Sequence, residues 1–208
     1  MNEKLKVGAL IWPQFTEWAS VKSMGVAAER EGYETLWTWD HVYPIIGNPN
    51  GPIFEGWSTL VAWAEATAQI RIGLMVGANT FRVPTLTAKL ATTLDHISNG
   101  RAILGIGGAW FAEEHEHFGL NFGDGFPERL RWLGEALPIM RGMLDGTEPT
   151  ATGPHYKAKT VRNLPAPIQK HLPIVIGGGG EQVTLKLVAK YGDANNVSGT
   201  RSEEHTSE

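Results

Sequence analysis

An aspartate and a histidine stand together where a strand-like segment ends. Residues 34–39 are rich in β-forming side chains, and Asp40 and His41 follow them directly, ahead of a loop broken by glycine and proline. Because an imidazole titrates near neutral pH, His41 is a candidate for exchanging a proton with a substrate, with Asp40 beside it. In the alternative interpretation Asp40 caps the loop and His41 is a hydrogen-bonded structural residue. The two residues alone leave both interpretations open.

Glycines gather at the end of another strand-like segment. Gly177, Gly178, Gly179 and Gly180 follow an apolar run and precede a helical pattern that begins at Glu181. Such a loop can present backbone N–H groups and a helix N-terminus to a phosphate. A glycine run by itself is often only a flexible loop. The position between a strand and a helix favours the anion site.

A second glycine group, formed by Gly105, Gly107 and Gly108, lacks the last glycine of a dinucleotide-binding fingerprint, because Trp110 stands in its place. We therefore reject a dinucleotide site here. Gly107 and Gly108 are expected to let a planar ring approach the protein, with Trp110 as a stacking wall. A tryptophan packed in the core beneath a loop is the alternative.

Acidic residues and histidines alternate over residues 113–117, which raises the possibility of a metal site. His115 and His117 are two residues apart, however, and would not share a helix face as the histidines of an H-E-x-x-H motif do. We expect the solvated start of a helix and no metal. Arg82, Arg101 and Arg129 receive no role, because arginines on a surface usually do no more than solvate it.

Strand-like and helical segments alternate along the chain. Strand patterns cover residues 7–12, 34–39, 70–76, 102–107, 173–176 and 194–197, and helical patterns cover residues 16–30, 57–68, 84–97, 127–143 and 181–191. This alternation predicts a parallel α/β fold, because each parallel strand needs a helical crossover to return to the sheet. Residues 146–172 carry four prolines and predict an irregular excursion with a short hairpin near Tyr156.

Two parallel architectures compete, a (β/α)8 barrel and an open doubly wound sheet. Residues suited to chemistry follow nearly every strand, at 12–13, 40–41, 77–79, 107–108 and 177–180. An open sheet would concentrate them at one switch point, whereas the top face of a barrel collects them around one site. We therefore predict an α/β fold of the TIM-barrel type that is incomplete, with about five and a half of the eight β/α units.

Composition excludes several classes of function. The 208 residues are 42% hydrophobic and 19% charged, which is typical of one globular domain. A net charge of -4 and a pI near 6.0 argue against a nucleic-acid partner. The absence of cysteine excludes disulfides and thiolate zinc sites. No apolar signal core and no membrane-spanning run is evident, which favours a cytoplasmic protein.

The last residues of the chain differ from the rest. Residues 201–208 are entirely polar and interrupt the sixth strand–helix unit. We interpret them as a non-native or disordered tail, and residues 1–200 as a truncated barrel domain.

Taken in order, these motifs resemble the luciferase-like monooxygenase superfamily, and within it the branch that depends on the deazaflavin coenzyme F-420. The resemblance covers about residues 5–200. The motifs that carry it are Trp-Thr-Trp-Asp-His at 37–41, Gly-Ala-Asn-Thr-Phe-Arg-Val-Pro at 77–84, Ala-Thr-Thr-Leu-Asp-His-Ile-Ser-Asn-Gly-Arg at 91–101, Leu-Gly-Ile-Gly-Gly-Ala-Trp at 104–110 and Gly-Gly-Gly-Gly-Glu at 177–181.

The resemblance implies that the top face of the barrel holds a flavin or deazaflavin ring, and that a bulge after the third strand supports the face of the ring. Met75, Val76, Gly77 and Ala78 occupy that place, with a cis peptide expected at Met75-Val76 or Val76-Gly77. The two glycine groups and Trp110 would complete the cofactor site. Sugar-phosphate dehydrogenases of this superfamily use a glutamate where Trp110 stands, so that activity is not expected. The family also suggests a homodimer.

Three hypotheses follow for the function. In the first, coenzyme F-420 exchanges a hydride with a small organic substrate while His41 transfers the proton. In the second, reduced flavin mononucleotide (FMN) activates oxygen to oxidise an alkane, an aldehyde or a sulfonate. In the third, the chain is a non-catalytic relative or a fragment that does not fold alone, because an unfinished barrel exposes sheet edges.

Overall fold

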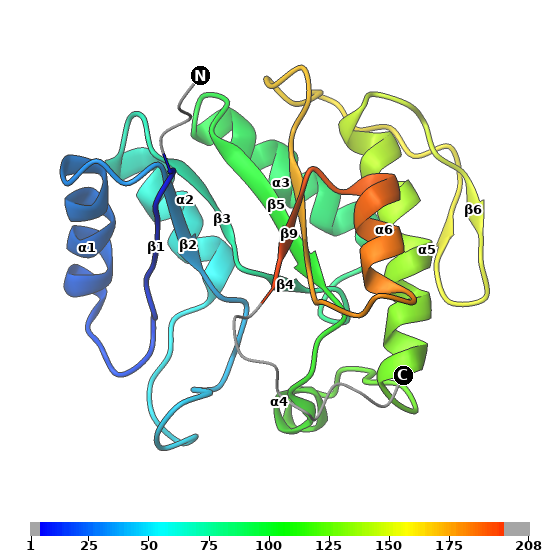
Figure 1. Ribbon diagram of the computed structural model, residues 1–208, viewed down its shortest axis with the longest axis horizontal. Helices are drawn as coiled ribbons and strands as arrows, with labels where there is room; N and C mark the ends of the chain where they lie inside the picture. The colour runs from blue at the N-terminus through cyan, green and yellow to red at the C-terminus, as the bar shows by residue number, and fades with distance from the viewer. Residues whose placement is uncertain (1–4, 198–208) are drawn as a thin grey trace.

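A curved parallel sheet runs through the centre of the structure, a computed structural model that describes residues 5–197 (Figure 1). The tail expected at 201–208 lies outside the described residues. The strands of the sheet are β1 (Gly8–Leu10), β2 (Thr35–Thr38), β3 (Arg71–Leu74), β4 (Gly77–Ala78), β5 (Ala102–Gly107), β8 (Ile174–Gly177) and β9 (Ala194–Asn196).

The order of the strands identifies the architecture. Neighbours pair in the order β1-β2-β3-β5-β8-β9, all parallel, and β4 continues the line of β3 beside β5. A doubly wound sheet would reverse its strand order at a switch point, whereas this order follows the chain throughout. The sheet is therefore an arc of a (β/α)8 barrel, as the sequence predicts.

Helices cover the convex face of the sheet (Figure 1). They pack in chain order, α1 on α2, α2 on α3, α3 on α5 and α5 on α6, while the short α4 lies at the end of the sheet where the strands finish. Among residues 5–197, no helix is both long and apolar enough to cross a membrane. The helices are α1 (Trp18–Arg30), α2 (Gly56–Ala66), α3 (Pro84–Ile97), α4 (Ala112–His117), α5 (Phe126–Leu144) and α6 (Thr184–Tyr191).

The two faces of the sheet bury different sets of side chains. Leu36 and Ile72 are fully buried in the main core beneath the helices. Trp37, Ile103 and Val175 form a separate buried group, which we call the inner cluster, on the opposite face. This division follows from the strand period of two, which sends successive side chains to opposite faces. The inner cluster is therefore the described part of the barrel interior.

The line of β3 and β4 contains a bulge. Gly73 pairs with Ile103 whereas Gly77 pairs with Ile106, so that four steps along one strand match three along the other. The Met75-Val76 peptide inside this bulge is cis. The predicted bulge after the third strand is confirmed, and the cis bond is the first of the two that were expected.

Glycines on the neighbouring strands leave room for the bulge. A Cβ atom at Gly105 would overlap the carbonyl oxygen of Leu74, and one at Gly107 or Gly177 would lie 2.9 or 2.5 Å from Cγ2 of Val76. The side chain of Val76 therefore occupies the space beside Gly107 and Gly177. That Gly107 lets a ring approach stays a prediction, and Val76 would lie between these glycines and such a ring.

The excursion after α5 carries the expected hairpin. Strands β6 (Ala151–Thr152) and β7 (Lys157–Ala158) pair in antiparallel fashion and flank Tyr156. The buried hydroxyl of Tyr156 donates to the carbonyl of Asn79, 3.0 Å away, and accepts from its side-chain amide. The hairpin therefore braces the backbone that follows β4.

The sixth helix begins later than predicted. The pattern from Glu181 predicts a helix there, whereas α6 starts at Thr184. Val183 has φ -123° and ψ -60°, and the amide of Leu185 donates to the carbonyl of Gly180. One irregular turn thus separates the glycine run from the helix.

Substitution of Gly105 by alanine tests whether the glycines accommodate the bulge. Gly105→Ala should destabilise the fold by about 1–3 kcal/mol or more, because the new methyl group meets a backbone carbonyl that cannot rotate away. Gly134→Ala in α5 is the matched control, since its methyl group would make only an ordinary contact with Leu187 at 3.8 Å. That control should stabilise the helix by roughly 0.5–1 kcal/mol. Urea unfolding measures both, and equal midpoints for Gly105→Ala and the unmodified chain would contradict the interpretation.

Candidate active site

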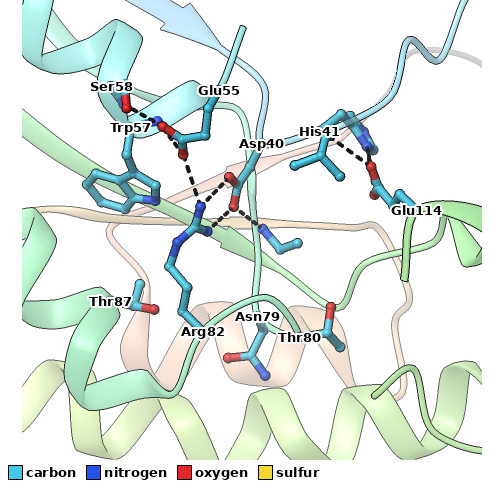
Figure 2. A network of polar contacts seen from close by, with 12 residues as sticks. Asp40, His41, Glu55, Trp57, Ser58, Asn79, Thr80, Arg82, Thr87 and Glu114 are labelled. Carbon is cyan, nitrogen blue, oxygen red and sulfur yellow. Dashed lines mark hydrogen bonds and ion pairs between the residues drawn. The ribbon is translucent and has the colours of Figure 1, made fainter. Parts of the chain in front are cut away.

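A buried carboxylate lies at the end of β2. The side chain of Asp40 is 2% exposed, and its two oxygens accept from Nη1 and Nη2 of Arg82 at 2.7 and 3.1 Å (Figure 2). Oδ2 of Asp40 also accepts from the backbone N–H of Ala78 at 3.0 Å. This two-pronged ion pair joins the end of β2 to β4 and to the loop before α3.

Arg82 also forms an ion pair with a second carboxylate, that of Glu55. Its Nη2 also donates to Oε1 of Glu55 at 3.1 Å. The same carboxylate accepts from the backbone amides of Trp57 and Ser58, and so caps the first turn of α2 (Figure 2). One guanidinium therefore ties together the end of β2 and the starts of α2 and α3.

Burial raises the pKa of Asp40 above its ordinary value of 3.8, because the charged form loses its water. The charge and hydrogen bonds of Arg82 and the N–H of Ala78 oppose that rise. The carboxylate of Asp40 is thus costly to bury and depends on Arg82.

His41 pairs with a different carboxylate from the one next to it in the sequence. Its Nδ1 lies 2.9 and 3.1 Å from the two carboxylate oxygens of Glu114, and Oε2 of Glu114 also accepts from the N–H of Val42 at 3.1 Å (Figure 2). The side chains of His41 and Glu114 are 14% and 1% exposed. The predicted pair of Asp40 and His41 is therefore two separate pairs that share a strand end.

The predicted solvated start of α4 is only partly correct, because Glu113, Glu116 and His117 are exposed while the two residues between them are not. Glu114 and His115 are both buried, because α4 turns them toward the loops after β2 and β4. Nδ1 of His115 donates to the carbonyl of Phe111 at 2.7 Å, and its Nε2 lies 2.6 Å from Oγ1 of Thr80. Burial lowers the pKa of His115, although the bond to Phe111 and the charge of Glu114 oppose the change. In residues 5–197 no group of three or more metal-binding side chains is present.

Aromatic rings form a row through His41. Trp12 stacks on Trp39 with ring centroids 5.1 Å apart, and His41 meets Trp39 and Trp110 edge to face at 6.1 and 5.4 Å. Trp110 in turn stacks on Phe111 at 5.4 Å. We call these five residues the aromatic row. Trp12 is 46% exposed and Trp110 is 58% exposed, so Trp110 is not a core tryptophan.

The glycine run after β8 keeps two of its N–H groups available. The amide of Gly178 donates to the carbonyl of Asn196, and the side chain of Asn195 donates to the carbonyl of Gly178. For the amides of Gly179 and Gly180 no acceptor is found within the described part of the chain. The irregular turn before α6 places the helix N-terminus beyond these amides, so the run offers backbone donors more directly than a helix end.

The two other arginines are structural. Arg101 is buried and donates to the carbonyls of Ala64, Thr67, Ile70 and Ser98 at the amino-terminal side of β5. It lies far along the strand from the site.

Arg129 acts nearer the site. It packs 3.7 Å over the ring of Phe122 and donates to the carbonyl of Ala109, whose φ is +63°. Arg129 therefore supports the loop that carries Trp110.

Removal of Arg82 tests the cost of the buried carboxylate. Arg82→Met should destabilise the chain by about 3–5 kcal/mol, because it leaves Asp40 buried without its counter-charge. Arg30→Met, which removes an exposed pair with Glu31, should cost under about 1 kcal/mol. The double variant Asp40→Asn/Arg82→Met should lose less than the two single losses added together. Strict additivity in urea unfolding would refute the coupling.

The lowered pKa of His115 predicts a loss of stability in mild acid. The unfolded chain binds a proton near the ordinary value of 6.5 while the folded chain resists it, so the free energy of unfolding should fall as pH falls through and below 6.5. His115→Gln should flatten this dependence between pH 7.5 and 5.5. His117→Gln, on the exposed side of the same helix, should leave it unchanged. Urea midpoints across that range measure the effect.

Comparison with known proteins finds a family model and relatives that match this chain. The family model described as luciferase-like monooxygenase matches residues 6–208. An F-420-dependent glucose-6-phosphate dehydrogenase of Amycolatopsis mediterranei is 30% identical over 170 residues, which are 81% of this chain and 50% of the relative. A pyrimidine monooxygenase of Acinetobacter baylyi is 30% identical over 146 residues, which are 70% of this chain and 39% of the relative.

A solved structure shares the fold. An F-420-dependent secondary alcohol dehydrogenase in complex with an F-420–acetone adduct superposes with a TM-score of 0.82 at 21% identity, over 93% of this chain and 58% of that one. The chain spans about half the length of the curated relatives that it matches, from 39% to 63%. The arc of β/α units, the bulge after β3 and the match over residues 6–208 lead to one conclusion: this chain belongs to the luciferase-like monooxygenase family.

Proposed function

We propose that the chain is the cofactor-bearing part of an oxidoreductase in which coenzyme F-420 and a small organic substrate exchange a hydride. The observation that carries the proposal is the position of His41 at the carboxyl ends of the strands, between the buried ring of Trp39 and the exposed ring of Trp110. Asp40, the preceding residue, binds the amide of Ala78 at the end of the bulge. A titratable ring therefore lies beside the surface where a planar cofactor would rest.

The residues present fit a flavin or deazaflavin ring. Met75 and Val76 pack on the inner cluster and give an apolar floor, which suits the face of a ring. The buried indole N–H of Trp39 has no acceptor within the described residues, which leaves a donor for a bound oxygen or nitrogen. The amides of Gly179 and Gly180, for which residues 5–197 provide no acceptor, suit an anionic group. When bound, the deazaflavin supplies the carbon that gives or takes the hydride.

The side chains then have separate tasks. As hydride leaves the carbon of an alcohol, His41 takes the proton from its hydroxyl group, and in the reverse direction it returns the proton to the carbonyl oxygen. Trp110 meets the ring of His41 directly, whereas Trp12 lies beyond Trp39 at the other end of the aromatic row; both rings would help to exclude water from this position. The inner cluster supports Met75 and Val76, which form the floor beneath the ring.

The surroundings of His41 favour a neutral substrate. Arg82 is the nearest cation of the network, and both of its terminal nitrogens are taken by Asp40 and Glu55. Trp110, an aromatic wall, stands where sugar-phosphate dehydrogenases of the superfamily are expected to carry an acid. A neutral alcohol, ketone or aldehyde with an apolar body therefore fits better than a phosphorylated sugar, although three relatives that the chain matches are named for glucose 6-phosphate.

The second candidate is an FMN-dependent monooxygenase that acts on an alkane, aldehyde or sulfonate with oxygen. The apolar floor at Met75 and Val76 supports this candidate as well as the first, because an apolar surface suits the ring of FMN and the ring of F-420 equally.

We also expect a homodimer from the family, which the elution volume of the purified protein would test.

Cofactor binding separates the two candidates. Quenching of F-420 fluorescence should show saturable binding to the chain, with weaker binding of FMN. His41→Gln should retain that binding and lose roughly 10²–10⁴-fold in turnover of a panel of secondary alcohols and ketones. His171→Gln, at the exposed amino-terminal side of β8, is the control and should change neither. Saturation by FMN without any by F-420 would replace the first candidate with the second.

A further inference from the structure

We propose that Glu114 is the positioning residue that decides which nitrogen of His41 carries the proton. The inference rests on the proposed function, in which His41 exchanges a proton with the substrate. Sequence alone gives Glu114 no role, since it stands in a segment that reads as a solvated helix start.

The contact geometry selects one tautomer. Both oxygens of Glu114 lie within 3.1 Å of Nδ1 of His41, and Oε2 also accepts from the N–H of Val42. A carboxylate that receives these donors is an acceptor, so Nδ1 must carry the hydrogen. In the neutral ring Nε2 then has the lone pair, and among residues 5–197 it has no hydrogen-bond partner. Nε2 is therefore the atom left for the substrate.

The helix holds Glu114 in this position. The adjacent His115 is locked on both ring nitrogens, to Phe111 and Thr80, and so fixes the rotation of α4 about its axis. Glu114 is 1% exposed, and its oxygens bind both the ring of His41 and the backbone of the next residue. The carboxylate therefore cannot turn into solvent without breaking two contacts at once.

This arrangement gives a balanced proton transfer. With an alcohol as substrate, the O–H bond would break and its proton would go to Nε2, the O–H electron pair would form the C=O bond, and a bound deazaflavin would be the acceptor for the hydride that leaves the carbon. The imidazolium that results lies 2.9 Å from the carboxylate of Glu114. Asp40 and Arg82 neutralise each other nearby, so Glu114 is the counter-charge to that imidazolium.

Glu114→Gln tests the inference with nearly the same shape. An amide can turn either its oxygen or its nitrogen toward Nδ1, so the constraint on the ring disappears. Nitrogen-15 NMR of the neutral ring should show His41 almost wholly protonated at Nδ1 in the unmodified chain and a mixture of tautomers in Glu114→Gln. Turnover should fall by roughly 10²–10⁴-fold, as in enzymes whose orienting carboxylate is replaced by an amide, with little change in KM or in the Kd for F-420.

Two further variants keep the test decisive. Glu116→Gln removes an exposed carboxylate from the same helix and should behave like the unmodified chain. Glu114→Asp retains an acceptor and should restore the Nδ1 tautomer in part, which also covers the case in which Glu114→Gln fails to fold. An unchanged tautomer of His41 in a folded Glu114→Gln chain would overturn the inference, and so would a Glu114→Asp chain in which His41 is mainly protonated at Nε2. Normal turnover by His41→Gln would overturn the proposed function instead, whatever the NMR result.

Discussion

The carboxyl end of the sheet is organised around one buried negative charge. The carboxylate of Asp40 has lost its water, and it is tolerable only with a counter-charge and donors in contact. Arg82 and the amide of Ala78 meet this need, which forces the loop before α3 to fold back over β2. Glu55 then joins the same guanidinium and starts α2. The contacts of Asp40 with Arg82 and Ala78 therefore also fix the backbone of the next residue, His41, although the ring of His41 takes no part in them.

The short helix α4 supplies a second anchor. Two adjacent residues of this helix contact different loops. Glu114 binds His41 in the loop after β2, and His115 binds Thr80 after β4. Arg129 supports the loop that leads into this helix through the carbonyl of Ala109. The loops at three strand ends are thus cross-braced by polar contacts. A ring between them would find its surroundings already in place, which is how a site avoids ordering costs on binding.

Much of the fold was predictable from the sequence, while the partners within the site were not. Strand 102–107 and helix 84–97 are predicted to the residue, because an apolar run, an initial proline and an Asn-Gly pair mark their ends. The positions of Asp40 and His41 follow from the end of their strand. Their partners are 42 and 73 residues away in the sequence, a separation that no local period reports. The burial of Glu114 could not be predicted, because the charged residues beside it in α4 are typical of a solvated helix.

The glycines around Val76 differ in what prevents their replacement by a larger residue. Gly105 faces a backbone carbonyl, so no change elsewhere in the sequence can create space for a side chain there. Gly107 and Gly177 face the methyl groups of Val76, and a smaller residue at 76 would release both. Related sequences should therefore vary together at 76, 107 and 177 while 105 stays constant. A smaller residue at 76 would relieve both contacts, but it would also remove the floor that we propose for the cofactor ring. If that proposal holds, selection for cofactor binding would keep Val76 where packing alone would allow a smaller side chain.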